Sequence, residues 1–404
     1  MKIMSIFLVG SDTSFIGQDK SEQEKKSDDI LTSLKLDKQL KLLVRTPEDL
    51  LSLNVHGLDG FVIFPYCSDR FSPLIYLADL NLPIIILSEN ETFGHALDTY
   101  EYLCNHSNVE IVFTPEELKA KIKTLTSAKW FENKICLFDA GEWKLDGAAY
   151  LKSPMFQGKL NTQIVDRTDF QKALANVDSA EAERTARKWT DEAAKILEPS
   201  FEDVIRSACV YLAMKTIIKN MEADAAYVLW CGQFTKQLGT KMCLALAKLA
   251  DDGIPVGCWR GENLLPLLIL HSVTKKPVFT CEAHTNSGKS FSVRHCFAPA
   301  TITSDRYVLR RWRNMEHTVT AYCQLQKGVV TLINMGTGSK IVIAKGKVTD
   351  CKDLEGDNCR ITVWIEPENE DIVHKLQGGE FALVYGDYAK QTRDVAEKLG
   401  LIVL

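Results

Sequence analysis

The sequence lacks several features that would place the protein in a common functional class. It has no apolar run near the 18 or more residues that a membrane-spanning helix requires. It has no excess of basic residues, because 48 Lys and Arg stand against 53 Asp and Glu, and this argues against nucleic acid as the main ligand. No GxGxxG motif follows an apolar run, so the main signature of a dinucleotide site is missing.

The twelve cysteines form no CxxC pair, and many of them stand within apolar runs. In a chain of 404 residues this usage is typical of a reducing cytoplasm, where cysteine acts as a small apolar side chain. The first ten residues are apolar but carry no small-residue cleavage site, so they predict a buried first strand rather than a signal peptide. We therefore expect a cytoplasmic protein.

The first third of the chain alternates short β-type runs with amphipathic segments. Each run is nearly continuous in apolar residues, which is typical of strands buried on both faces of a parallel sheet. The predicted strands are residues 3–10, 41–45, 59–65, 83–88 and 109–113. The predicted helices are residues 71–80, 92–104 and 114–125. The last of them starts with Thr114 as the capping residue and Pro115 at the first helical position.

The same alternation restarts after a polar stretch at residues 126–129. Predicted strands follow at residues 134–140, 162–165, 225–231, 254–258 and 277–281. Predicted helices lie between them at residues 178–198, 201–221, 238–250 and 262–274. Both α/β segments are therefore predicted to be doubly wound parallel sheets.

The pattern changes after about residue 290. Short runs with period-two alternation and intervening turn residues predict an antiparallel barrel or sandwich. The predicted fold is thus α/β, with two doubly wound parallel-sheet domains followed by a β-rich, antiparallel barrel-like domain. The predicted boundaries are residues 1–128, 129–290 and 291–404.

Two carboxylates follow successive predicted strands of the middle domain. Glu262 comes shortly after the strand that ends at Cys258, and Glu282 directly follows the strand that ends at Cys281. Ligands of open α/β sheets bind at the carboxyl edge, so these side chains predict a site for a hard divalent cation or for acid/base chemistry. A carboxylate favoured by the helix dipole explains Glu262 equally well, and a solvated loop acid explains Glu282.

Cysteine and histidine offer another metal site in the same region. Cys281, His284, His295 and Cys296 are ligand types that zinc accepts. Buried structural cysteines are the commoner outcome for apolar runs of this kind, so we favour that interpretation.

Several segments in this half resemble the fucose/arabinose isomerase superfamily, particularly its shorter fucose-isomerase-like members. The matching segments are LALAKLADDGIPVGC, LLILHSVTKKPVF and SVRHCFAP, followed by GVVTLINM and FALVYGDY in the family's order. The resemblance spans residues 225–404 and implies an aldose–ketose isomerase. In that family a divalent metal, usually Mn²⁺, is held by two carboxylates and a histidine, and the carboxylates move a proton through an enediol.

The family's ligands transfer to this chain with three changes. Glu282 stands where the second carboxylate is expected, as Glu in place of Asp. The first carboxylate normally follows the cysteine directly, but Trp259 follows Cys258 here and Glu262 lies three residues further on. Glu380 stands where the family histidine precedes the closing strand. The resemblance therefore implies Glu262 and Glu282 as catalytic residues, and Glu262, Glu282 and Glu380 as ligands of Mn²⁺ or Mg²⁺.

We expect a sugar isomerase-like protein that converts a small sugar or sugar derivative through an enediol. The alternatives are a non-catalytic carbohydrate-binding relative, and a lyase or epimerase that uses the same enolate chemistry. The resemblance also implies a homo-oligomer, either a trimer or a hexamer, in which neighbouring subunits complete the cleft. We expect neither nucleic acid nor a membrane as a partner.

Overall fold

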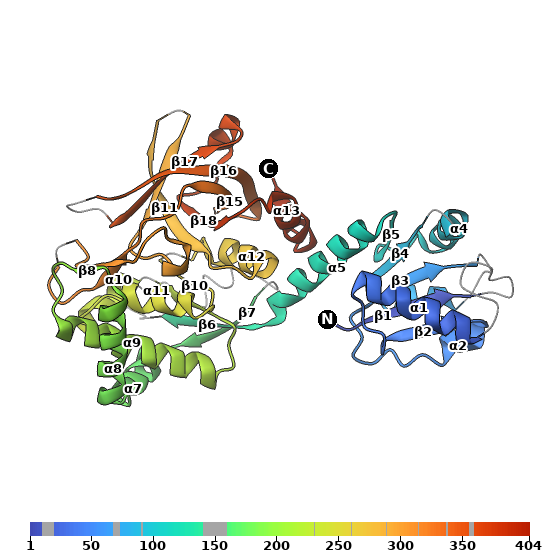
Figure 1. The fold of residues 1–404 in the computed structure, drawn as a ribbon, viewed down its shortest axis with the longest axis horizontal. Helices are drawn as coiled ribbons and strands as arrows, with labels where there is room; N and C mark the ends of the chain where they lie inside the picture. The colour runs from blue at the N-terminus through green and yellow to red at the C-terminus, as the bar shows by residue number, and fades with distance from the viewer. Residues whose placement is uncertain are drawn as a thin grey trace. The chain divides into compact units, whose positions relative to one another are not determined.

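The computed structural model describes residues 1–9, 20–67, 73–89, 92–139, 160–229, 231–259, 261–287, 289–313, 315–336, 338–354 and 359–404. Predicted elements also include residues 10, 71, 72, 140 and 230, which lie outside these ranges. The chain forms two compact units, Met1–Thr126 and Ser127–Leu404 (Figure 1). None of the helices in the described ranges has the length and apolar character needed to cross a membrane.

The first unit contains the predicted parallel sheet. Its strands are β1 (Ile3–Leu8), β2 (Lys41–Val44), β3 (Gly60–Pro65), β4 (Ile84–Leu87) and β5 (Val109–Val112). They lie in the order β2-β1-β3-β4-β5, and every pair is parallel. The helices are α1 (Lys20–Leu34), α2 (Pro47–Leu51), α3 (Leu74–Asp79), α4 (Phe93–Leu103) and α5 (Pro115–Lys129).

Both faces of this sheet are buried, as its apolar strands predict. Residues of α1 and α5 pack on one face, and residues of α2, α3 and α4 pack on the other. The predicted start of α5 is confirmed, because the Glu117 amide donates to Thr114 Oγ1 at 3.1 Å and the Phe113 amide donates to Glu117 Oε2 at 2.7 Å.

The second unit begins with another parallel sheet in the order β10-β9-β6-β7. Its strands are β6 (Lys134–Asp139), β7 (Asn161–Val165), β9 (Ala225–Leu229) and β10 (Val256–Trp259). Its helices are α7 (Arg167–Ala175), α8 (Ser179–Glu192), α9 (Phe201–Asn220), α10 (Cys231–Leu238), α11 (Cys243–Asp251) and α12 (Leu264–Thr274). Helix α8 ends earlier than predicted, and β8 (Lys195–Ile196) follows it.

A closed antiparallel barrel makes up the rest of the second unit. Its strands are β11 (Phe279–Asn286), β12 (Phe291–His295), β15 (Gly328–Met335), β16 (Lys340–Asp353), β17 (Ile361–Pro367) and β18 (Glu380–Tyr385). They follow the order β15-β18-β11-β12-β17-β16, and β15 pairs with β16 to close the barrel. The sequence prediction of an antiparallel barrel is confirmed.

Shorter elements complete the second unit. Strand β8 joins β13 (Val308–Arg310) and β14 (Thr320–Tyr322) in a small sheet. At the end of the chain, α13 (Ala389–Lys398) precedes β19 (Ile402–Val403), which pairs with β16 in parallel.

One predicted strand belongs to a different sheet. Residues 277–281 were expected to extend the second parallel sheet, but β11 pairs antiparallel with β12 and β18 in the barrel. The physical reason is the short connection to β12, because antiparallel strands accept a hairpin whereas parallel strands need a long crossover. Ser287 and Ser290 close this connection with a backbone hydrogen bond of 2.8 Å.

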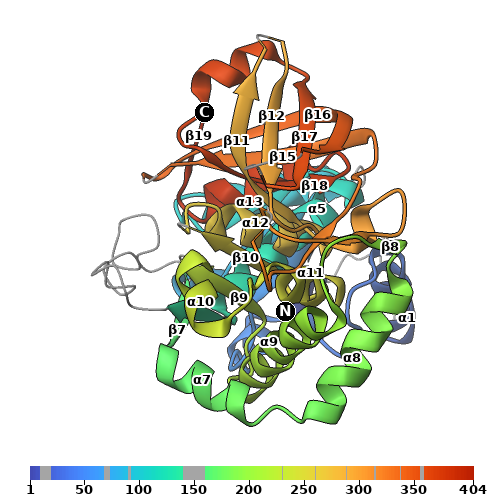
Figure 2. The ribbon, with the colours of Figure 1, turned by 90° about the vertical axis from the view of Figure 1, so that its left-hand side faces the viewer.

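The barrel and the second parallel sheet share an apolar core. Side chains of α12 pack against β6 and β9 on one side and against β15, β16 and β18 of the barrel on the other. Figure 2 shows α12 between the barrel strands and the parallel sheet. Helix α12 carries Leu or Ile at most of its positions, so it is buried almost all round.

Candidate functional site

A cavity of about 200 Å³ lies where the parallel sheet meets the barrel in the second unit. Strand β10 ends at its wall with Cys258 and Trp259, and helices α10, α11 and α12 begin beside it. The barrel contributes residues of β11, β12 and β18. The cavity therefore lies at the carboxyl edge of the parallel strands, where open α/β sheets bind ligands, and near the positive ends of three helices.

The residues at the end of β10 are held in place by Tyr227 of β9. Gly257 leaves room for the Tyr227 ring, because a Cβ atom at Gly257 would lie 2.8 Å from it. The Tyr227 hydroxyl donates to Asn263 Oδ1 at 2.6 Å and accepts the Gly261 amide at 3.1 Å. The backbone N–H of Asn263 in turn donates to Glu380 Oε2 at 3.0 Å. These contacts connect the parallel sheet to the first residue of β18.

Trp259 has an unusual backbone conformation at the cavity wall. Its φ angle is +111°, a region that a bulky side chain rarely adopts. Such strain persists only where the surrounding structure fixes it, and it is concentrated at functional sites. Trp259 and Trp312 give the cavity two indole rings.

Two of the three predicted carboxylates line the cavity. Glu282 of β11 and Glu380 of β18 are directly paired across the antiparallel ladder, so their side chains share one face of the sheet. Glu282 also forms an ion pair of 2.9 Å with Arg294 of β12, whereas Glu380 is only 3% exposed. Glu262 is not among the lining residues, and its carboxylate lies beside Gly378.

The residues present do not form the ligand set that the sequence implies for Mn²⁺ or Mg²⁺. Within the described ranges, no three His, Cys, Asp or Glu side chains are grouped so that they hold an ion. Glu282 is already paired with Arg294, and Glu262 lies outside the cavity lining. The hard-cation site therefore stays a prediction.

Cysteine, rather than carboxylate, is the most frequent residue in the cavity lining. Six of the twelve cysteines surround it, namely Cys231, Cys243, Cys258, Cys281, Cys296 and Cys359. Sequence reasoning treated them as apolar core residues. The available signal was position, because Cys231 and Cys258 both stand at the carboxyl ends of predicted strands.

The thiols contact one another and His295. Cys258 Sγ lies 3.6 Å from His295 Nε2, and Cys296 Sγ lies 3.2 Å from Cys359 Sγ. A hydrogen bond from Cys258 to Cys231 lowers the pKa of the Cys231 thiol, although burial acts in the opposite direction. Donation of that hydrogen bond and burial raise the pKa of Cys258 well above its usual value.

His295 is an internal imidazole with a changed protonation equilibrium. Its side chain is 8% exposed, and its Nδ1 atom makes no hydrogen bond of normal geometry with the described residues. Burial lowers the pKa of His295 to about 4, although the nearby Phe297 backbone acts the other way. The imidazole is therefore neutral at neutral pH.

The suggested zinc set of Cys281, His284, His295 and Cys296 is brought together only in part, because His284 does not line the cavity.

Two cations form another part of the cavity wall. Lys241 is buried with its ammonium group 3.9 Å from the centre of the Trp312 ring, and the Arg313 guanidinium lies 4.5 Å from the same ring. Lys241 also contributes to the lowered pKa of Cys231. Positive charge at this wall stabilises thiolates and anionic ligand groups.

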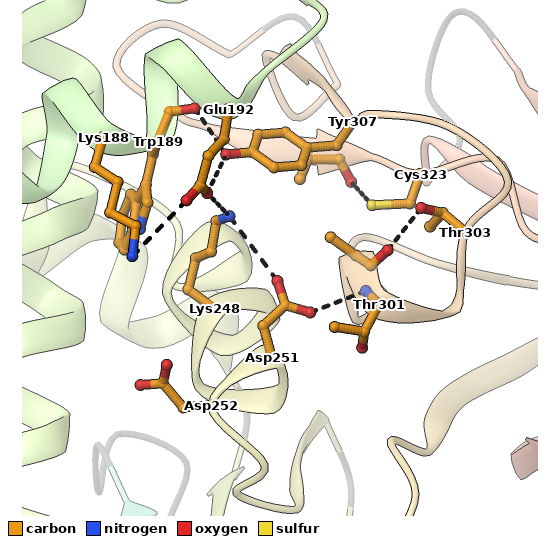
Figure 3. Close-up of polar contacts among 12 residues, drawn as sticks. Lys188, Trp189, Glu192, Lys248, Asp251, Asp252, Thr301, Thr303, Tyr307 and Cys323 are labelled. Atoms are coloured by element: carbon orange, nitrogen blue, oxygen red, sulfur yellow. Dashed lines mark hydrogen bonds and ion pairs between the residues drawn. The ribbon is translucent and has the colours of Figure 1, made fainter.

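A second polar cluster surrounds Lys248 on α11, as Figure 3 shows. Lys248 Nζ lies 2.9 Å from Glu192 Oε2, 3.9 Å from Asp251 Oδ2 and 4.1 Å from the centre of the Tyr307 ring. The Tyr307 hydroxyl donates to the Trp189 carbonyl at 2.7 Å. Because Lys248 contacts both carboxylates, the cluster is best explained as a polar connection between α8, α11 and the segment before β13.

Comparisons with known proteins do not identify a family. No protein-family model matches the chain, and no curated protein matches it. Among solved structures, one match is an ABC transporter solute-binding protein from Agrobacterium vitis bound with alpha-D-tagatopyranose. It is 10% identical, covers 58% of this chain and 80% of that chain, and has a TM-score of 0.16, which is too low to support an argument about fold or ligand.

Proposed function

We propose that the cavity is the active site of an enzyme that moves a proton between neighbouring carbons of a small sugar or sugar derivative. The observation that carries the proposal is the cross-strand pair of Glu282 and Glu380 in an enclosed cavity at the carboxyl edge of the parallel sheet. Aldose–ketose isomerisation needs this type of pair, because one carboxyl group removes a proton while another group delivers one.

The two carboxyl groups have different surroundings, and this supports separate roles. Glu282 forms an ion pair with the Arg294 guanidinium, which fixes its carboxylate at the cavity, and we assign to Glu282 the removal of the proton from the substrate carbon. Glu380 is buried opposite Glu282 and accepts the Asn263 backbone amide. We assign to Glu380 the delivery of a proton to the substrate oxygen or the adjacent carbon.

The rest of the cavity suits a small polyhydroxylated molecule. Trp259 offers an indole ring for the carbon–hydrogen face of a sugar, while Lys241 and Arg313 offer hydrogen-bond donors. The resemblance to fucose-isomerase-like proteins supports the same substrate class. We also propose Mn²⁺ or Mg²⁺ as a cofactor, a trimeric or hexameric assembly and a cytoplasmic location, each of which requires its own test.

Hydrogen exchange with solvent tests the proposed reaction directly. The protein is incubated in D₂O with a panel of aldoses and ketoses, with and without Mn²⁺, and the products are followed by NMR. We expect deuterium at the carbon next to the carbonyl group together with formation of the isomeric sugar. Glu282→Gln and Glu380→Gln should each reduce the rate by about 10²–10⁴-fold, which is the usual contribution of one proton-transfer group.

The controls separate the alternatives. Glu366→Gln changes an exposed carboxylate of β17 outside the cavity and should leave the rate unchanged. Sugar binding without any exchange would favour the carbohydrate-binding alternative, and a dehydrated or epimeric product would favour the lyase or epimerase. Loss of exchange in Glu262→Gln would show that Glu262 takes part as the sequence predicted. Light scattering that gives a monomer would contradict the expected assembly.

A further inference from the structure

The cysteines of the cavity are brought together from distant parts of the chain. Cys231 begins α10, Cys258 lies in β10, and His295 ends β12. Cys243, Cys296 and Cys359 line the same cavity. Thiolate and imidazole are the donor types that soft and borderline metal ions prefer, whereas carboxylate and carbonyl oxygens suit Mg²⁺ and Mn²⁺.

The separation of Cys258 and His295 matches that of two ligands of one metal ion. Zn–S bonds are about 2.3 Å and Zn–N bonds about 2.0–2.1 Å, so sulfur and nitrogen ligands at two corners of a tetrahedron lie about 3.6 Å apart. The observed distance between Cys258 Sγ and His295 Nε2 is 3.6 Å. Cys231 lines the same cavity as Cys258 and His295.

These residues belong to one buried group at the cavity. His295 is a buried imidazole, and its Nε2 atom lies 3.6 Å from Cys258 Sγ. Lys241 lines the same cavity, with its ammonium group near Gly232. A buried imidazole whose ring nitrogen contacts a thiol is therefore the second observation, besides the number of cysteines, that indicates a ligand.

We propose that Cys231, Cys258 and His295 bind a thiophilic divalent cation of the Zn²⁺ class, with the fourth position open to the cavity. Two thiolates and one neutral imidazole are one of the ligand sets that zinc uses when it keeps a position free. No three of the described residues are already grouped around one point, so binding requires a rotation of the Cys231 or Cys258 side chain. The proposal goes beyond the sugar chemistry and does not depend on it.

Cobalt(II) provides the test, because Co²⁺ replaces Zn²⁺ and has visible absorption bands. The full chain, reduced with a phosphine and freed of metal, is titrated with Co²⁺ in the absence of oxygen and of any sugar. We expect one equivalent to bind with a sulfur-to-cobalt charge-transfer band and intense tetrahedral bands, and we expect Zn²⁺ to displace it. Cys258→Ser and His295→Gln should each weaken binding by roughly 10-fold or more.

Matched variants keep the test specific. Cys104→Ser changes an exposed cysteine and Cys323→Ser a buried cysteine outside the cavity, and both should bind Co²⁺ as the unchanged protein does. The double variant Cys296→Ser/Cys359→Ser should also retain the charge-transfer band. Circular dichroism confirms the folding of each variant, and His295→Gln serves if Cys258→Ser does not fold.

Two results would overturn the proposal. The first is a reduced, folded protein that binds no Co²⁺ or binds it without a charge-transfer band. The second is a band that disappears in the Cys296→Ser/Cys359→Ser variant but persists in Cys258→Ser and His295→Gln. Because no sugar is present, failure of the isomerase proposal would leave this result unchanged, and the reverse also holds.

Discussion

Glu282 and Glu380 stand directly opposite each other on β11 and β18, and Arg294 stands opposite Glu282 on the other side, in β12. The three side chains therefore leave the barrel sheet on the same face, in one row across three strands. The row therefore contains two carboxyl groups and one guanidinium. The two carboxyl groups of this row line the cavity, and their alignment arises from the register of the barrel strands.

The first prediction concerns the buried carboxyl group of Glu380, which accepts the Asn263 amide proton. Glu380→Ala removes this acceptor and leaves a buried amide without a partner, so the free energy of unfolding should fall by about 1–3 kcal/mol. Glu380→Gln keeps an acceptor and should lose less. Urea denaturation measures both, with Glu366→Ala as an exposed control. An alanine variant as stable as the unchanged protein would show that repulsion from Glu282 outweighs the hydrogen bond.

The second prediction concerns Lys248, which is 8% exposed and contacts Glu192 and Asp251. Lys248→Met removes the cation nearest to Asp251 and leaves Glu192 with only Lys188, so the free energy of unfolding should fall by about 1–3 kcal/mol, less than for a fully buried pair because Glu192 is partly solvated. Lys345→Met removes a partly exposed cation from two surface ion pairs and should change stability little. Equal effects of the two variants in urea denaturation would contradict this assignment.

The third prediction uses the φ angle of +111° at Trp259. At ordinary strand positions, glycine is less stable than alanine by about 0.5–1 kcal/mol. At Trp259 the order should reverse, because glycine adopts this φ without strain whereas alanine does not. Trp364 in β17 has no positive φ angle, so it is the matched site where alanine should remain the more stable variant. Thermal unfolding of the four variants checks the reversal, and the same order at both sites would disprove it.

The fourth prediction concerns the pH dependence that His271 confers. Burial first, and then the charge of Lys275, lower the pKa of His271 from 6.5 to about 4 in the folded protein. Between these pH values the unfolded chain binds more protons than the folded chain, so stability falls as the pH falls from about 6.5 towards 4. His271→Gln should remove about 2 kcal/mol of the stability difference between pH 7 and pH 5.

Urea midpoints at pH 7 and pH 5 measure this difference, and His56→Gln controls for the loss of an exposed histidine. A pH difference that is the same in His271→Gln and in the unchanged protein would mean that other groups control the acid sensitivity. His295, whose pKa is also lowered to about 4, is the next candidate in that case.

Local patterns were sufficient to predict most elements of the fold. Continuous runs of Ile, Val, Leu and Phe predicted the parallel strands, because strands buried on both faces exclude polar residues. Period-two alternation predicted the barrel, and Thr114 before Pro115 predicted the start of α5. The strand at β11 was found, but its sheet was assigned wrongly, because an isolated apolar run does not specify its partner strand.

The candidate site was only partly visible in the sequence. Glu282 and Glu380 were named from a strand end and from the family resemblance, and both line the cavity. Glu262 was named by the same reasoning, yet its side chain is absent from the lining, because residues 261–263 turn before α12 begins.

The sequence by itself determined the order and type of the elements, because these depend on residues close together in the chain. Only the tertiary structure decided that Cys258 and His295 come within 3.6 Å and that Glu282 and Glu380 share a face. Such contacts depend on strand register and on the packing of α12 between two sheets. Contacts between residues far apart in the chain leave no local periodicity, so they are fixed by packing and are not visible in the sequence pattern.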